Sequence, residues 1–342
     1  MKKPFCLAIA IIFSVLLFEL KTPAASAIEI TGCLGVDSPL EVMDLNHQDD
    51  SCIDNLGSVI FQNGVILSMP NVGEETMFVG LTSDGIENQI RIWRNAQGLV
   101  GAEENQTFYG EAYNVAEPYN SNIAPAINDS LGNTDLGCLS QSYSPSPWRH
   151  YSVFSWWYNP LNESSIRALD RIKAAMNLWR FPTNRCTGES FATNFQAAYQ
   201  GLTSSTSSLI SASGEYCKTN FDGKNVISWG KLPSRFLGGT CVRRDYLDNV
   251  ILETDIRLSV DYTGSFFDYS STYQCGIGDY LLVNVAAHEI GHAIGFEHSS
   301  ADYHQLMSPN ATECTHDFVG LAPGDYLGLQ QKYGVLNDYQ AV

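Results

Sequence analysis

Residues 288–298 have the sequence His-Glu-Ile-Gly-His-Ala-Ile-Gly-Phe-Glu-His, the pattern HExxHxxGxxH. Residues four apart lie on the same face of a helix, so His288 and His292 are expected to present two imidazoles to one metal ion. Glu289 then lies beside the metal, where a carboxylate can take a proton from a bound water. This stretch therefore predicts a helical metal site with a general base built into it.

The end of the same stretch supplies a third ligand. Gly295 has no Cβ and can adopt the left-handed conformation that ends a helix, which lets the chain turn so that His298 faces the metal. Three protein ligands leave one position for water, the arrangement of a catalytic zinc site. Two other interpretations are a buried helix with hydrogen-bonded histidines and a zinc site without activity; the retained Glu289 argues against the second.

These residues resemble the metzincins, a superfamily of zinc-dependent endopeptidases. The resemblance extends to the methionine turn that metzincins carry after the third histidine, because Leu306-Met307-Ser308-Pro309 follows His298 at a fitting distance. It implies that Met307 forms a hydrophobic floor under the metal. Taken alone, one methionine near a proline would indicate ordinary core packing.

Within the metzincins, residues 140–336 are most similar to the matrixins, the matrix metalloproteinases and their bacterial relatives. The matching segments are a first amphipathic helix (164–181), a core strand (222–230), a substrate-binding edge strand (237–242), the last sheet strand (251–258) and a C-terminal helix (321–334). The resemblance implies an α+β catalytic domain with a twisted, mixed, five-stranded sheet and three helices. It also implies that substrate binds along Leu237, Gly238, Gly239 and Thr240.

The sequence departs from the matrixin pattern in two places. It has no His/Asp-rich loop of the kind that holds a second, structural zinc in vertebrate matrixins, so one zinc ion is expected. Ser308 stands where those enzymes usually have tyrosine. Pro309 stands two residues after Met307, where astacin-like and serralysin-like enzymes have tyrosine, so no fifth, tyrosine ligand is expected.

The N-terminus is typical of a signal peptide. Lys2 and Lys3 precede an apolar run, and Ala25-Ser26-Ala27 forms an A-x-A cleavage site, so residues 1–27 are expected to be removed. A less favoured alternative is lipidation at Cys33. The apolar run is short for a membrane span, and no other candidate span is present. A secreted protein, extracellular or periplasmic, without stable membrane insertion is therefore expected.

The cysteines fit an exported protein. Without Cys6 of the signal peptide, eight remain, and an even number in an exported chain predicts disulfide bonds. Their spacing does not fix the pairing, and none has the CxxC spacing of a zinc site. They lie at positions 33, 52, 138, 186, 217, 241, 275 and 314.

The chain is strongly acidic, with a formal net charge of −18. This argues against nucleic acid as a partner, because no basic patch would neutralise phosphates. Carboxylate clusters also occur in structural Ca²⁺ sites, although a solvated acidic surface explains the charge more simply. The candidate calcium ligands are Asp222, Asp245, Asp248, Asp261 and Asp268.

The length predicts two domains. Residues 28–115 have β-rich patterns, including a hairpin around Asn63-Gly64, and residues 116–136 are rich in Pro, Asn and Ser, as a linker is. Residues 137–342 form the expected zinc protease domain. The first region is either an accessory domain, which is slightly favoured because the matrixin latency motif PRCGxPD is absent, or a propeptide.

The function predicted from the sequence is a secreted, monomeric zinc endopeptidase acting on proteins or peptides, with Glu289 as general base. The alternative is a secreted adhesion or carbohydrate-binding protein that carries an inactive protease-like domain and draws its function from residues 28–115.

Overall fold

The structure is a computed structural model. It describes residues 40–41, 58–61, 65–82, 88–105, 138, 141–165, 167–207, 209, 215–217, 222–232, 235–260, 266–267, 279–299, 305–309, 311 and 320–335. The expected signal peptide, residues 1–27, and the expected linker, residues 116–136, lie outside these ranges.

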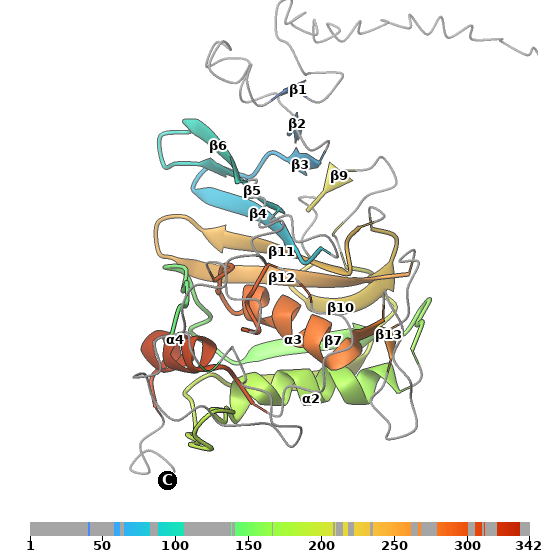
Figure 1. Cartoon of the computed structure of the whole chain (residues 1–342). Coiled ribbons are helices and arrows are strands. Elements are labelled where there is room, and N and C mark those ends of the chain that lie inside the picture. Colours follow the sequence, from blue (N-terminus) through green and yellow to red (C-terminus); the bar gives the residue numbers. More distant parts are fainter. Residues whose placement is uncertain are drawn as a thin grey trace, which may run out of the picture.

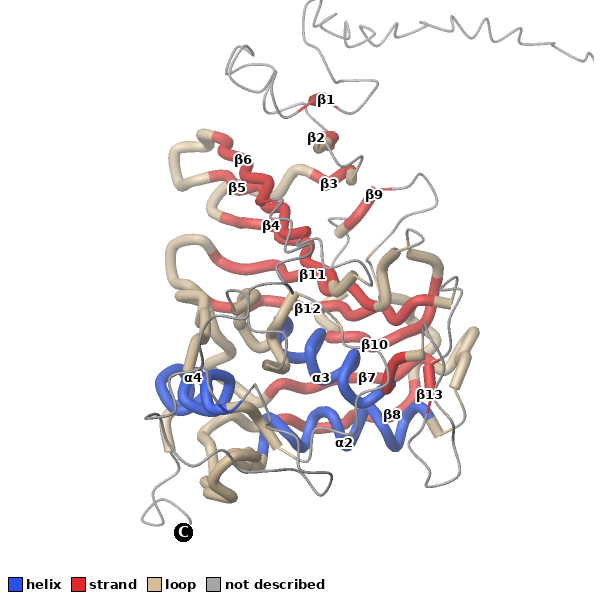
Figure 2. Tube along the Cα trace, in the orientation of Figure 1, coloured by secondary structure: helices blue, strands red, loops and turns tan. Residues whose placement is uncertain are grey.

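A mixed sheet of eight strands forms the centre of the described fold (Figures 1 and 2). Its strand order is β6-β5-β4-β11-β12-β10-β7-β8. The bounds are β4 (Glu74–Gly80), β5 (Asn88–Arg94), β6 (Val100–Asn105), β7 (Phe154–Asn159), β8 (Ala197–Leu202), β10 (Asn225–Gly230), β11 (Gly238–Asp245) and β12 (Val250–Ser259). The strands from β12 to β8 pair in parallel, whereas the pairings from β12 to β6 are antiparallel.

Three helices are described: α2 (Ala168–Arg180), α3 (Leu282–Ala293) and α4 (Pro323–Tyr333). Helices α2 and α3 lie side by side, and α3 also contacts β11 and β12 (Figure 1). The indole Nε1 of Trp179 on α2 donates a hydrogen bond of 2.8 Å to the carbonyl of Ala287 on α3. This contact fixes α3, the helix that carries the first two predicted ligands, against the apolar core between the helices and the sheet.

The expected mixed sheet with three helices in an α+β fold is present, but the expected count of five strands is wrong. Strands β11, β12, β10, β7 and β8 are the five that the catalytic region supplies. The N-terminal region adds β4, β5 and β6 beyond β11. An open sheet edge presents unpaired N–H and C=O groups, and any β-prone segment of the same chain can pair with them.

Smaller sheets also bring distant segments together. Strands β1 (Leu40–Glu41), β2 (Ser58–Ile60), β3 (Ile66–Ser68) and β9 (Glu215–Tyr216) form a four-stranded sheet, and β13 (Phe266–Phe267) pairs with β14 (Tyr280–Leu281). A second buried apolar cluster combines N-terminal side chains such as Leu67 and Phe78 with side chains such as Tyr216 and Phe236. The N-terminal region thus shares a hydrophobic core with the region after residue 137.

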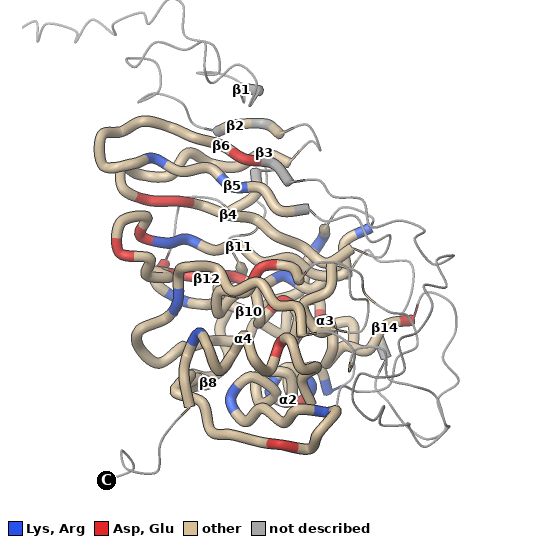
Figure 3. Tube along the Cα trace, turned by 60° about the vertical axis from the view of Figure 1, so that its left-hand side comes forward, with Lys and Arg blue, Asp and Glu red and all other residues tan. Residues whose placement is uncertain are grey.

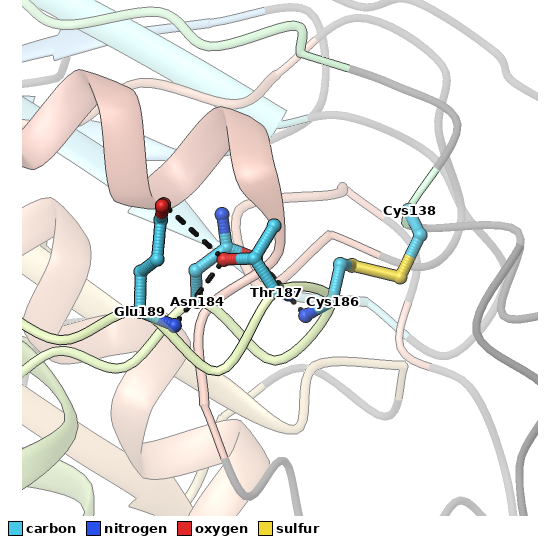
Figure 4. Close-up of a disulfide and its surroundings, with 5 residues drawn as sticks. All are labelled: Cys138, Asn184, Cys186, Thr187 and Glu189. Carbon is cyan, nitrogen blue, oxygen red and sulfur yellow. Dashed lines mark hydrogen bonds between the residues drawn. A yellow bond between two sulfur atoms is a disulfide. The ribbon is translucent and has the colours of Figure 1, made fainter. Parts of the chain in front are cut away.

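Two disulfide bonds join described cysteines, which confirms that the cysteines form disulfides. Cys138 pairs with Cys186 (Figure 4), and Cys217 pairs with Cys241. The Asn184 side-chain oxygen accepts a hydrogen bond of 3.0 Å from the Cys186 backbone N–H, which orders the loop at the first bond. The other cysteines lie outside the described residues. No helix in the described part of the chain is long and apolar enough to cross a membrane.

Candidate metal centre

Helix α3 places His288 and His292 one turn apart on the same face, and both side chains are buried. The Nε2 atom of His292 lies 2.9 Å from that of His288, and the Nε2 atom of His298 lies 3.2 Å from His288 and 3.1 Å from His292. The three imidazoles therefore converge on one point through the same ring nitrogen.

The other ring nitrogens of two of these histidines bind backbone carbonyls. Nδ1 of His288 donates to the carbonyl of Leu306 at 2.7 Å, and Nδ1 of His292 donates to the carbonyl of Phe296 at 2.8 Å. These bonds orient the rings and leave Nε2 unprotonated in the neutral imidazole. Burial, together with the neighbouring imidazoles, lowers the pKa of His288 and His292 well below the usual value.

The turn after α3 follows the expectation from the sequence. The helix ends at Ala293, and Gly295 has a φ of +94°, in the left-handed region that glycine enters without steric cost. A Cβ at this position would also lie 2.4 Å from the carbonyl oxygen of Trp148. Only glycine fits here, and the reversal that it allows brings His298 back to the two helical histidines.

Glu289 is fully buried, and its carboxylate has two hydrogen-bond donors. The Thr240 hydroxyl on β11 donates to Oε2 at 2.6 Å, and the backbone N–H of Leu81 donates to Oε1 at 3.2 Å. Burial raises the pKa of Glu289 to about 8, and the bonds from Thr240 and Leu81 act in the opposite direction. The structure thus brings together the predicted general base and one predicted substrate-binding residue, Thr240.

The methionine turn lies close under α3. A Cβ at Gly291 would lie 2.2 Å from Sδ of Met307, so the turn approaches the helix at a position with no side chain. Asp325 of α4 fixes the turn by accepting a hydrogen bond of 2.7 Å from the N–H of Leu306 and one of 3.3 Å from that of Met307. Burial raises the pKa of Asp325 to about 6.

The residues present fit a zinc ion. In a tetrahedral site with Zn–N bonds of about 2.05 Å, neighbouring nitrogens lie roughly 3.3 Å apart, close to the separations of the three Nε2 atoms. Among the described residues, these three histidines are the group of His, Cys, Asp or Glu side chains that could hold a metal ion. Calcium is therefore not supported by the described residues. Two of the candidate calcium ligands, Asp261 and Asp268, lie outside the described ranges.

The predicted substrate-binding strand differs from expectation in its position. Strand β11 was expected at the edge of the sheet, but β4 pairs with it over Thr240 to Asp245, so the edge position is wrong for the folded chain. The predicted residues Leu237, Gly238 and Gly239 precede this pairing, and Thr240 begins it. Gly238 lies so close to Glu289 that a Cβ there would meet its Cγ at 2.7 Å.

The roles of two residues at the site were not predicted from the sequence. Leu81 donates a hydrogen bond to Glu289, and Asp325 accepts hydrogen bonds from the methionine turn. Leu81 lies in the region 28–115 that was recognisable as β-rich, but a β-rich pattern carries no information about which strands pair with one another. Asp325 was recognised only as part of the C-terminal helix.

Comparisons with known proteins agree with this geometry. The family model of the matrixins matches residues 251–334. Stromelysin-3 from Rattus norvegicus is 41% identical over 68 residues, a match that covers 20% of this chain and 13% of that protein. The fold and the histidine site define a zinc-peptidase-like metal centre. Residues 251–334 therefore resemble part of a matrixin, a metzincin domain, and the fold and the three histidines agree with this resemblance.

Proposed function

We propose that this protein is a secreted zinc-dependent endopeptidase. The observation that carries the proposal is the convergence of three buried imidazole Nε2 atoms, two of them on the helix that also carries the buried carboxylate of Glu289. The matrixin match over residues 251–334 supports the same class. The two disulfides support secretion, because such bonds persist in oxidising compartments.

His288, His292 and His298 would hold the zinc ion. When bound, zinc supplies a Lewis acid and lowers the pKa of a water molecule towards about 7. Glu289 would act as the general base that takes a proton from the attacking water, and it would deliver that proton to the nitrogen of the leaving amine. Thr240 holds the carboxylate in place by its hydrogen bond to Oε2. The peptide substrate would extend along Leu237–Thr240 through main-chain hydrogen bonds.

The test is hydrolysis of casein or gelatin by the purified zinc-loaded protein, with and without a chelator. Glu289→Ala should keep its zinc, because the carboxylate is not a ligand. Its rate of hydrolysis should fall by at least the factor of about 10²–10⁴ that general acid–base catalysis contributes. Glu297→Ala, in the same motif, is the matched control and should retain turnover. Normal hydrolysis by Glu289→Ala would refute the mechanism.

The same assay decides between this proposal and the adhesion or carbohydrate-binding alternative. A zinc-loaded protein that hydrolyses neither substrate would favour the alternative. Proteins or peptides are the proposed partners, and a monomer is the proposed state in solution.

A further inference from the structure

The end of helix α3 leads the chain to His298. The final carbonyl groups of a helix have no partner within the helix and need donors from elsewhere. Here two of the donors are side chains of other segments. Nε2 of His150 donates to the carbonyl of Ala293 at 3.0 Å, and the hydroxyl of Tyr333 on α4 donates to that of Ile294 at 2.7 Å. The end of α3 is therefore tied to two other parts of the fold.

The turn after α3 pairs with residues 144–148, which we call the anchor segment. The carbonyl of Gly295 accepts hydrogen bonds from both the N–H of Ser146, at 3.0 Å, and its hydroxyl, at 2.6 Å. Two residues later, the N–H of Glu297 donates to the first carbonyl of the anchor segment at 2.8 Å. Because His298 follows this short antiparallel pairing directly, the position of the anchor segment determines where the third predicted ligand lies.

Lys332 of α4 holds the anchor segment through its side chain. Lys332 is 7% exposed, and its Nζ donates to the carbonyls of Ser146, at 2.8 Å, and Trp148, at 2.5 Å. The amine also lies at the turn, because a Cβ at Gly295 would meet Nζ at 2.7 Å. Burial lowers the pKa of Lys332 to about 7. A buried amine needs acceptors, and the anchor segment provides them.

Strand β11 holds the anchor segment from the sheet. The guanidinium of Arg244 lies 3.8 Å from the ring centroid of Trp148 and pairs with the carboxylate of Glu75 on β4. Figure 3 shows the acidic part of β4 beside the basic part of β11. The anchor segment is thus fixed both to α4 and to the sheet, and it can transmit the position of these elements to the turn.

We propose that Lys332 is a positioning residue for the third metal ligand. By holding Ser146 it fixes the carbonyl of Gly295, and through the turn it fixes the imidazole of His298. This inference rests on the metal centre of the proposed function and concerns how tightly that centre binds a metal ion. Groups that contact a metal ligand typically change metal affinity by about 10–100-fold. Lys332 acts one step further out, so an effect near the lower limit is expected.

Binding of Co²⁺ to the metal-free protein gives the main test, because the d–d absorption of Co²⁺ reports both its affinity and the arrangement of its ligands without turnover. Lys332→Met keeps most of the side-chain length and removes the donor. It should raise the dissociation constant for Co²⁺ about tenfold, or about 1.4 kcal/mol, and shift the d–d bands. Tyr158→Phe is the matched control, because it also removes a buried group that hydrogen-bonds two side chains, Glu163 and Trp229. It should leave both readouts unchanged. Parental Co²⁺ binding by Lys332→Met would overturn the inference.

A double-mutant cycle separates the positioning of His298 from a general loosening of the fold. In a His298→Ala background, Lys332→Met should cause no further loss of Co²⁺ affinity, because the ligand through which it acts is gone. An equal tenfold loss in that background would overturn the inference.

Ser146→Ala decides the matter if Lys332→Met does not fold. It removes one of the two hydrogen bonds to the carbonyl of Gly295 and should weaken Co²⁺ binding in the same direction, by less than tenfold. An unchanged dissociation constant would contradict the inference. If Co²⁺ binding responds as expected but the zinc-loaded parent hydrolyses no casein, the proposed function fails and the positioning of His298 stands.

Discussion

Gly238→Ala should disable the proposed catalytic centre without removing any functional group. The added Cβ would lie 2.7 Å from both Cγ and Oε1 of Glu289. Ordinary contacts between carbon atoms are about 3.5–4.0 Å, so the carboxylate has to move by roughly 1 Å. A displacement of this size can cost about 10²-fold in rate. We expect kcat for a fluorogenic peptide to fall about a hundredfold relative to the parent chain, with full zinc content by elemental analysis.

The neighbouring glycine provides the control. A Cβ at Gly239 would point away from Glu289 and meet Phe78 at 2.9 Å and Leu209 at 3.3 Å. Gly239→Ala should therefore lower the free energy of unfolding by about 1–3 kcal/mol, as overpacking does, without lowering kcat. Parental turnover in Gly238→Ala, or an equal loss in both variants, would refute the assignment of the effect to the carboxylate.

Three further changes test other parts of the site. His298→Ala should lose zinc during dialysis against a mild chelator, since one of three protein ligands is removed. Lys332→Met should lower the free energy of unfolding by about 1–3 kcal/mol, because the carbonyls of Ser146 and Trp148 lose their donor. Asp325 has a pKa of about 6 when folded, above the unfolded value of about 3.9, so its contribution to stability is present below about pH 4 and is lost as pH rises through 6. Asp325→Asn should remove this loss, which amounts to up to about 3 kcal/mol in the free energy of unfolding. In the metal-free protein, the free energy of unfolding of the variant should therefore depend less on pH. Zinc retained by His298→Ala, or unchanged unfolding in either other variant, would contradict these expectations.

The elements with a strong local signal were predictable from the sequence. The amphipathic pattern over residues 164–181 predicted α2, which spans Ala168–Arg180, and the HExxH stretch predicted the helix that is α3. Both depend on contacts between residues three or four apart, which the sequence displays directly. The pairing of β4 with β11 joins segments more than 150 residues apart. No local pattern specifies such a pairing, and the strand count was therefore wrong.

The candidate site likewise contains residues that local sequence patterns predicted and residues whose role depends on tertiary packing. The spacing of His288, His292 and His298 was sufficient to bring three nitrogens together, because one helix and one glycine turn control it. The donors to Glu289 come from β11 and from the residue after β4, so they depend on tertiary packing. The role of Asp325 likewise depends on α4 lying against a turn that precedes it by 18 residues.

The division of the chain into 28–115 and 137–342 remains a prediction, and the structure shows why cutting between the two parts would be an ambiguous experiment. Removing residues 28–136 would take away β4 and bare the main-chain groups of β11. It would also expose Phe236 and the Cys217–Cys241 disulfide, which are buried in the shared cluster. A gain in turnover would then be offset by lost stability and by aggregation at the open edge. Truncation would therefore change the exposure of β11 and the stability of the shared core at the same time, and one turnover measurement would not separate the two effects.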